Sequence, residues 1–157
     1  MAHRRLLKAE YNPETHESIA TVSSQYGVFT HTVVCDESDY DVENRFDGII
    51  IAENKCHRDI AAAKVQDYRI RLKEAEHIYN VLCTQSDSAF PEDSFIKENM
   101  EVVNALRKQV AIAQREYDAA KTELLSFDLW IADRAKNYAE VRRELREKAA
   151  LLHSEED

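Results

Sequence analysis

An alternating spacing of three and four residues runs without interruption through the last third of the chain. Its members are Val103, Leu106, Val110, Ala113, Tyr117, Ala120, Leu124, Phe127, Ile131, Arg134, Tyr138, Val141, Leu145, Lys148 and Leu152. Only Arg134 and Lys148 among them are charged. This spacing places every member on one stripe of a helix wound at about 3.5 residues per turn. It predicts a long helix whose stripe, here called the seam, needs a covering surface.

A second helix with its own shorter repeat precedes the long one. We expect it over residues 54–84, with Asn54 as a suitable N-cap. The long helix is expected over residues 91–152, with Pro91 in its first turn. Because the link between them is short, the two helices should form an antiparallel hairpin, and residues 53–157 should fold as one continuous unit.

Residues 1–52 show the composition of strands and turns instead. Candidate strands, rich in alternating or β-branched residues, lie at 6–11, 18–23, 28–35 and 49–52. They predict a small antiparallel sheet with an acidic loop at residues 36–47. The fold class is therefore expected to be α+β, with an N-terminal sheet followed by a long, coiled-coil-like helical hairpin.

The two helices differ in length, so the shorter cannot cover the whole seam. At 1.5 Å per residue they would measure about 46 Å and about 90 Å. We expect the sheet to cover the region of Phe127–Ile131 and a second chain to cover part of the rest, with a break near Ser126 as a further option. The residues assigned to this core or self-association surface are Phe127, Trp130, Ile131, Tyr138, Val141, Leu145 and Leu152.

The amino-acid composition favours a folded helical protein and disfavours nucleic-acid-binding and membrane-spanning proteins. Of the 157 residues, 44% are hydrophobic and 32% are charged, which is typical of a folded helical domain. The net charge of −9 disfavours direct contact with nucleic acid or an anionic membrane. No apolar run is long enough to span a bilayer. Because the first residues also hold no apolar stretch of signal-peptide length, we expect a cytoplasmic location. The three cysteines, Cys35, Cys56 and Cys83, are widely spaced, so we expect no disulfide framework.

The acidic loop is the first candidate site for a partner. We expect its acids to steer a protein with a basic surface and its aromatic residues to anchor it. The candidate residues are Asp36, Glu37, Asp39, Tyr40, Asp41, Glu43, Phe46 and Asp47. A calcium loop starting at Asp39 is disfavoured, because Asn44 stands where glycine is needed and Ile50 where a bidentate glutamate is needed.

No motif for catalysis or for a cofactor is recognisable. His31, Cys35, Cys56 and His57 could in principle supply a zinc site or a Cys/His nucleophile, but their spacing matches no common motif. With two glycines the chain has little material for a phosphate-binding loop. We therefore expect no enzyme, no cofactor and no metal.

The favoured hypothesis is a non-enzymatic protein-binding module that acts through its hairpin and acidic loop, with a homodimer expected. A sharper version is an inhibitor that presents carboxylates to the basic nucleic-acid channel of a nuclease. In size and charge the chain is similar to small acidic anti-defence proteins of bacterial viruses, among them inhibitors of CRISPR nucleases. The alternatives are a structural coiled-coil subunit of a larger assembly and, less favoured, an enzyme or metalloprotein.

Overall fold

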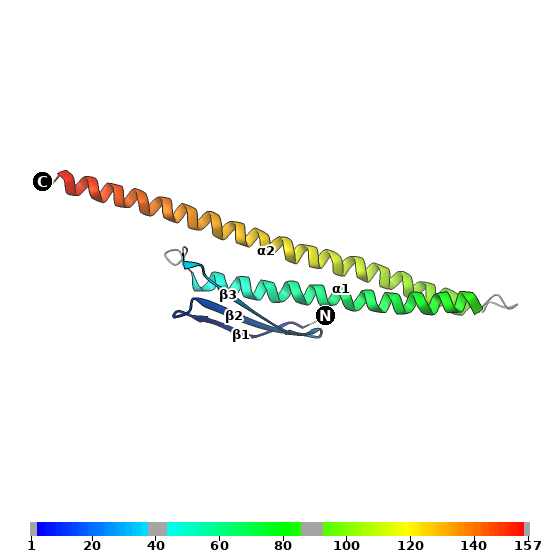
Figure 1. Cartoon of the computed structure of the whole chain (residues 1–157). Helices are drawn as coiled ribbons and strands as arrows, with labels where there is room; N and C mark the ends of the chain where they lie inside the picture. The colour runs from blue at the N-terminus through cyan, green and yellow to red at the C-terminus, as the bar shows by residue number, and fades with distance from the viewer. Residues whose placement is uncertain (1–2, 38–43, 86–92, 156–157) are drawn as a thin grey trace.

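The computed structural model of the chain describes residues 3–37, 44–85 and 93–155. Three strands come first and two long helices follow (Figure 1). Their bounds are β1 Arg5–Asn12, β2 Glu17–Ser24, β3 Gly27–Val34, α1 Arg45–Gln85 and α2 Asp93–Glu155. The predicted α+β class, with a small antiparallel sheet ahead of a helical hairpin, is confirmed.

The sheet is an antiparallel meander with β2 between β1 and β3. The turn into β3 uses Gly27 at a φ of 126°, a backbone region that residues with a side chain rarely adopt. Alternate residues of β2, namely Ser18, Ala20 and Val22, are buried. Because successive side chains of a strand point to opposite faces, this pattern identifies the face of the central strand that is covered.

Helix α1 is the middle layer of the molecule, with the sheet against one side and α2 along another (Figure 1). Val22 of β2 and Cys56 and Ile60 of α1 form a buried cluster, and Tyr26 and Phe29 pack against it. The spacing of four residues between Cys56 and Ile60 brings them to the same side of α1. The core that joins the sheet to the hairpin therefore lies on α1.

The predicted strand at residues 49–52 is wrong, because these residues belong to α1, which begins at Arg45 and not near residue 54. Asn44 caps the helix at this earlier point, where its Oδ1 accepts a hydrogen bond of 2.9 Å from the N–H of Phe46. A short apolar run suits a buried helical turn as well as a buried strand, and periodicity alone does not separate them.

Gly48 lies where α1 packs closely against β2. A Cβ atom at this position would lie 2.8 Å from the Cβ of Ser18 and closer still to its Oγ. The glycine is therefore required by the close approach of the helix to the strand, and not by a turn. Because α1 continues across residues 52 and 53, the predicted boundary between sheet and hairpin falls inside a single helix.

Helix α2 is one continuous helix, without a break near Ser126. Its buried residues are Val103, Ala113 and Leu124, all members of the seam. Within the described residues α2 contacts α1 but no strand, so these residues face α1. The expectation that the sheet covers the region of Phe127–Ile131 is therefore wrong: the sheet packs on α1, which lies between it and α2.

Candidate functional site

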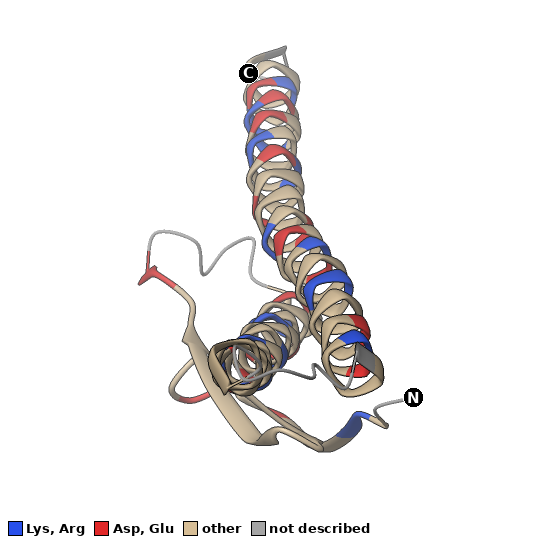
Figure 2. Ribbon diagram, turned by 90° about the vertical axis from the view of Figure 1, so that its right-hand side faces the viewer, with Lys and Arg blue, Asp and Glu red and all other residues tan. Residues whose placement is uncertain are grey.

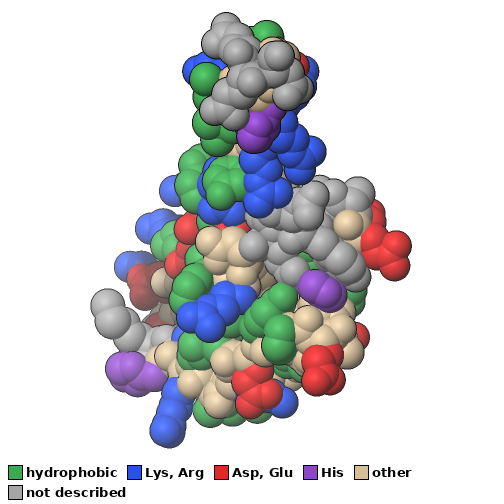
Figure 3. Space-filling model, turned by 90° about the vertical axis from the view of Figure 1, so that its left-hand side faces the viewer, with side chains coloured by type: hydrophobic (Ala, Val, Ile, Leu, Met, Phe, Trp, Pro, Cys, Tyr) green, Lys and Arg blue, Asp and Glu red, His purple; other side chains and the backbone are tan. Residues whose placement is uncertain are grey.

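The C-terminal part of α2 projects beyond the rest of the molecule (Figure 1). We call residues 135–155 the projecting segment. The seam continues along it with large apolar side chains that are more than half exposed. These are Tyr138 at 54%, Val141 at 54%, Leu145 at 60% and Leu152 at 65%. Viewed from this end, apolar and basic side chains stand out together from the body of the protein (Figure 3).

The same seam is covered further back, where α1 lies alongside it. Polar contacts flank the covered part: Lys64 Nζ lies 2.8 Å from Glu116 Oε2, and Arg107 Nη2 lies 3.5 Å from Glu76 Oε1. Cover ends where Arg134 forms an ion pair with Asp47 in the first turn of α1. The charged residue on the seam thus marks the point at which α2 leaves its intramolecular partner.

Aromatic side chains gather at this point of departure. The rings of Phe127 and Trp130 stack with their centres 5.7 Å apart, and the Arg134 guanidinium lies 4.8 Å from the centre of the Trp130 ring. Phe127 and Ile131 are partly buried, whereas Trp130 is half exposed. The predicted surface residues therefore divide into two groups, with Phe127 and Ile131 at the edge of the hairpin contact and the others open to solvent.

Residues of both charge signs alternate along α2, including the projecting segment (Figure 2). The sequence from 135 to 155 holds five basic side chains and four acidic ones, a net charge of +1 in a chain whose total is −9. Arg142 lies over the Tyr138 ring, 5.1 Å from its centre. An apolar stripe with charged flanks is typical of a helix that pairs with another helix.

The predicted acidic loop is only partly visible. Asp39, Tyr40, Asp41 and Glu43 lie outside the described residues. Asp36 and Glu37 are exposed after β3. Phe46 is exposed in the first turn of α1, with the Arg45 guanidinium 4.8 Å from its ring centre. Asp47 is engaged by Arg134, so its carboxylate is directed into the molecule.

A groove of about 870 Å³ lies between the end of β3, the first turns of α1 and one side of α2 from Asp128 to Arg146, which includes the first half of the projecting segment. Basic side chains of α2 line one wall: Lys136, Arg142, Arg143 and Arg146. Asp36, Asp47 and His16 contribute to the remaining lining. Asp128 also lines the groove, but Asp47 is paired with Arg134, so the four basic side chains outnumber the remaining acidic ones.

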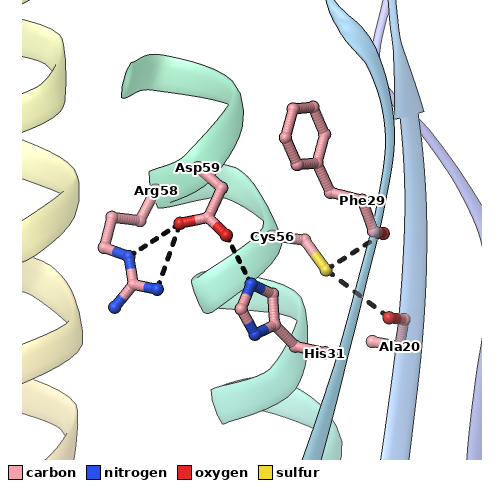
Figure 4. A network of polar contacts seen from close by, with 6 residues as sticks. All are labelled: Ala20, Phe29, His31, Cys56, Arg58 and Asp59. Atoms are coloured by element: carbon pink, nitrogen blue, oxygen red, sulfur yellow. Dashed lines mark hydrogen bonds and ion pairs between the residues drawn. The ribbon is translucent and has the colours of Figure 1, made fainter. Parts of the chain in front are cut away.

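The four residues considered for zinc or nucleophilic chemistry do not form one site. The Cys56 thiol is fully buried and donates to the backbone oxygens of Ala20 and Phe29, at 3.4 and 3.3 Å (Figure 4). Burial raises the pKa of this thiol, which opposes formation of a nucleophilic thiolate. His57 lies between Arg4 and Glu53 instead, with its Nδ1 3.0 Å from the guanidinium.

His31 has a partner that sequence reasoning missed. Its Nε2 donates to Asp59 Oδ2 at 2.5 Å, and Arg58 donates to the other carboxylate oxygen (Figure 4). Burial by itself would raise the pKa of Asp59, but the hydrogen bonds from His31 and Arg58 outweigh it and hold the pKa below its usual value. The network links β3 to α1. His31 and Asp59 are 28 residues apart, so no local sequence pattern predicts their contact.

Among residues 3–37, 44–85 and 93–155, no group of three or more His, Cys, Asp or Glu side chains could hold a metal ion. In the same ranges neither helix has an apolar stretch of the length that crossing a bilayer requires. No protein-family model matches the chain, and no curated protein or solved structure is significantly similar to it.

Proposed function

We propose that this chain is a non-enzymatic protein-binding module that binds its partner through the projecting segment of α2. One observation carries the proposal: the seam that α1 covers at Val103, Ala113 and Leu124 continues through residues 138–152 with no contact to another helix or strand in the part of the chain that the structure describes. Contiguous apolar patches of this kind on soluble proteins mark interaction sites. The three cysteines are all outside disulfides, in keeping with a cytoplasmic location.

The shape of the surface favours a helix as its ligand. In its covered part the seam already accepts a helix, α1, in antiparallel orientation. The uncovered part keeps the same spacing of three and four residues, so it presents the same pattern of knobs and holes. Recognition of this kind uses apolar anchors at helical spacing, with charged residues on the flanks.

The acidic loop and the inhibitor hypothesis stay predictions. Asp36 and Glu37 are exposed and could meet a basic partner, but Asp47 is already paired with Arg134. Of the six acidic residues in the candidate loop, the five other than Asp47 would therefore have to meet the basic partner. Assembly as a structural subunit is a variant of the same proposal, since it would use the same seam.

The experiment compares two leucines of α2 that are equally exposed. Leu145 lies on the seam and Leu129 lies off it, and both are 60% exposed. We expect the tagged wild type and Leu129→Glu to retain the same proteins from an extract of the source cells, and Leu145→Glu to lose them. Because neither side chain is buried, both variants should keep the wild-type circular dichroism and stability to within about 0.5 kcal/mol. Retention of the same proteins by all three would overturn the proposal.

A further inference from the structure

We infer that the groove between β3, α1 and α2 binds an acidic peptide segment of a partner protein, one that carries apolar side chains among its carboxylates. The site goes beyond the proposed function, because the basic side chains that line the groove do not belong to the seam. Two properties of the groove lead to this ligand: the positive charge of its lining along α2 and the apolar character of much of the rest.

Basic residues of the projecting segment gather on the side of α2 that lines the groove. Four of the five basic residues in the range 135–155 belong to the lining, namely Lys136, Arg142, Arg143 and Arg146. Glu140, Glu144 and Glu147 alternate with them in the sequence, yet none is among the described residues that line the groove. Basic side chains are prominent on α2 where it leaves the body of the protein (Figure 3). The helix thus separates charges that are mixed in the sequence, because residues three, four and seven apart share a side.

These basic side chains are hardly neutralised within the chain. Among the described residues, Lys136 and Arg146 form no ion pair. Arg143 reaches Glu147 only at 4.0 Å, with both side chains about 70% exposed. Arg142 lies over the Tyr138 ring, a contact that does not cancel its charge. Guanidinium groups bind carboxylates in a planar, two-pronged geometry, so a ligand with carboxylates suits this lining.

The acidic residues of the groove leave it a net positive charge. Asp47 is paired with Arg134, so Asp36 and Asp128 oppose four basic side chains. Asp128 precedes Arg142 by 14 residues, which separates them by about 21 Å along the helix. The positive end of the groove therefore lies on the projecting segment and is distant from Asp128.

The groove also has an apolar lining that a simple anion would not use. Ala132, Ala135 and Ala139 follow one another at intervals of three and four residues, so they form a strip that lets another chain approach α2 closely. Val34 at the end of β3 lines the groove as well, and it is 59% exposed. Covering these groups with apolar side chains is favourable, and phosphate or another small anion would leave them in water.

The length of the groove suits a short peptide. The side of α2 from Asp128 to Arg146 is about 27 Å long at 1.5 Å per residue, which an extended chain of about eight residues would match. A nucleic acid is less suited. Beyond the groove it would meet a chain with a net charge of −9, which repels a polyanion.

The first test measures fluorescence anisotropy of a labelled synthetic peptide of about eight residues, alternating glutamate and leucine, against the full chain. We expect weak binding that falls as the salt concentration rises, since exposed ion pairs each contribute little and salt screens them. The same peptide with glutamine in place of glutamate should bind at least about tenfold more weakly. Equal binding of the two peptides, or no binding of the acidic one, would overturn the inference.

The second test compares two charge reversals on the projecting segment. Arg146 lines the groove and Lys148 does not, and both are exposed. Arg146→Glu and Lys148→Glu lower the net charge equally. We expect the first to weaken binding of the acidic peptide at least about fivefold and the second to leave it within about twofold. Equal losses would mean that the peptide responds to the charge of the helix as a whole, and the groove would lose its role.

Uncharged variants separate the groove from the seam. Ala139→Trp should fill the groove and abolish binding of the acidic peptide, whereas Ala150→Trp, at an exposed alanine outside the lining, should not. Leu145→Ala shortens a seam side chain without adding charge and should also bind as the wild type does. Circular dichroism checks that all three fold. Loss of binding on Leu145→Ala but not on Ala139→Trp would move the peptide to the seam and contradict the inference.

Two other occupants of the groove are distinguished by the same variants. A single-stranded oligonucleotide that binds the wild type more tightly than the acidic peptide, and loses this binding on Arg146→Glu but not on Lys148→Glu, would make the groove a nucleic-acid site. Sedimentation equilibrium of the chain alone tests a second copy. A dimer that Arg146→Glu dissociates and Lys148→Glu does not would place a second copy in the groove. Either result would replace the acidic peptide as the ligand.

Discussion

Asp47 and Arg134, 87 residues apart in the sequence, form an ion pair that joins the first turn of α1 to the middle of α2. The carboxylate is 13% exposed and the guanidinium 35% exposed, so water screens the pair only in part. The acid also lies near the positive end of α1, where a negative charge is favourable. This one contact closes the hairpin at its open end and divides the covered seam from the projecting one.

Removing either partner of this ion pair should destabilise the protein. We expect Asp47→Ala and Arg134→Leu each to lower the free energy of unfolding by about 1–2 kcal/mol, because the remaining charge is left partly buried. A double-mutant cycle, measured by urea unfolding at low protein concentration, should show a coupling of about 0.5–1.5 kcal/mol. Strictly additive effects would mean that the two side chains do not interact.

An exposed ion pair on the same helix provides the control. Arg143 Nε and Glu147 Oε1 are 4.0 Å apart, and both side chains are about 70% exposed. Arg143→Leu should change the free energy of unfolding by no more than about 0.5 kcal/mol.

Gly48→Ala should destabilise the protein, although alanine is normally the better helix former. The usual gain of about 1 kcal/mol from replacing a helical glycine is outweighed by the contact between the new methyl group and Ser18. We expect a net loss of about 1–2 kcal/mol in urea unfolding. Gly48→Ala combined with Ser18→Gly should recover most of it, because the second change removes both atoms that clash. A single variant as stable as the wild type would show that α1 can move away from β2 at no cost.

Cys56 should be the slowest of the three thiols to react with iodoacetamide. It is fully buried, its thiol donates to two backbone oxygens, and burial raises its pKa, so the protein must open locally before a thiolate can form. Cys35 and Cys83 are only partly buried. Mass spectrometry of timed alkylation at pH 8 should show Cys56 modified at least about tenfold more slowly than either. Equal rates for all three would place Cys56 outside the core.

The stabilising effect of Asp59 should depend on pH. Its pKa in the folded protein lies below the unfolded value of about 4, so its contribution is present above that value and is lost as the pH falls through the folded pKa. Asp59→Asn should therefore cost about 1 kcal/mol at neutral pH and progressively less in acid. Urea unfolding of both proteins between pH 7 and the acid limit of folding measures this difference. A difference that stays constant with pH would exclude the ionised carboxylate as its source.

Periodic spacing was sufficient to predict both helices and their antiparallel pairing, because a long stripe at intervals of three and four residues fits little else. It was insufficient at residues 45–52, where three isoleucines and a glycine fit a strand as well as a helix. The deciding contacts were those of Asn44 with the backbone of Phe46 and of Gly48 with Ser18. The second of these depends on the meeting of two distant segments, which local sequence does not show.

The candidate site could be predicted only in part, again because local sequence does not show which distant segments meet. The unequal lengths of the helices were sufficient to predict that part of the seam is uncovered. The sequence does not identify the partner of Arg134, because Asp47 fits an acidic loop as well as the first turn of a helix. Because α1 begins at Arg45, Asp47 lies beside Arg134, and α1 separates the sheet from α2.

The position of α1 as the middle layer also affects how this chain can evolve. The part of α1 that lies over the sheet has packing partners on two sides, so we expect its small buried residues, such as Ala52 and Ala61, to change slowly among descendants of this sequence. The outward-facing residues of the projecting segment have no such double constraint. Natural variation should therefore collect there, beside a stripe of four or five residues that selection for a partner would hold unchanged.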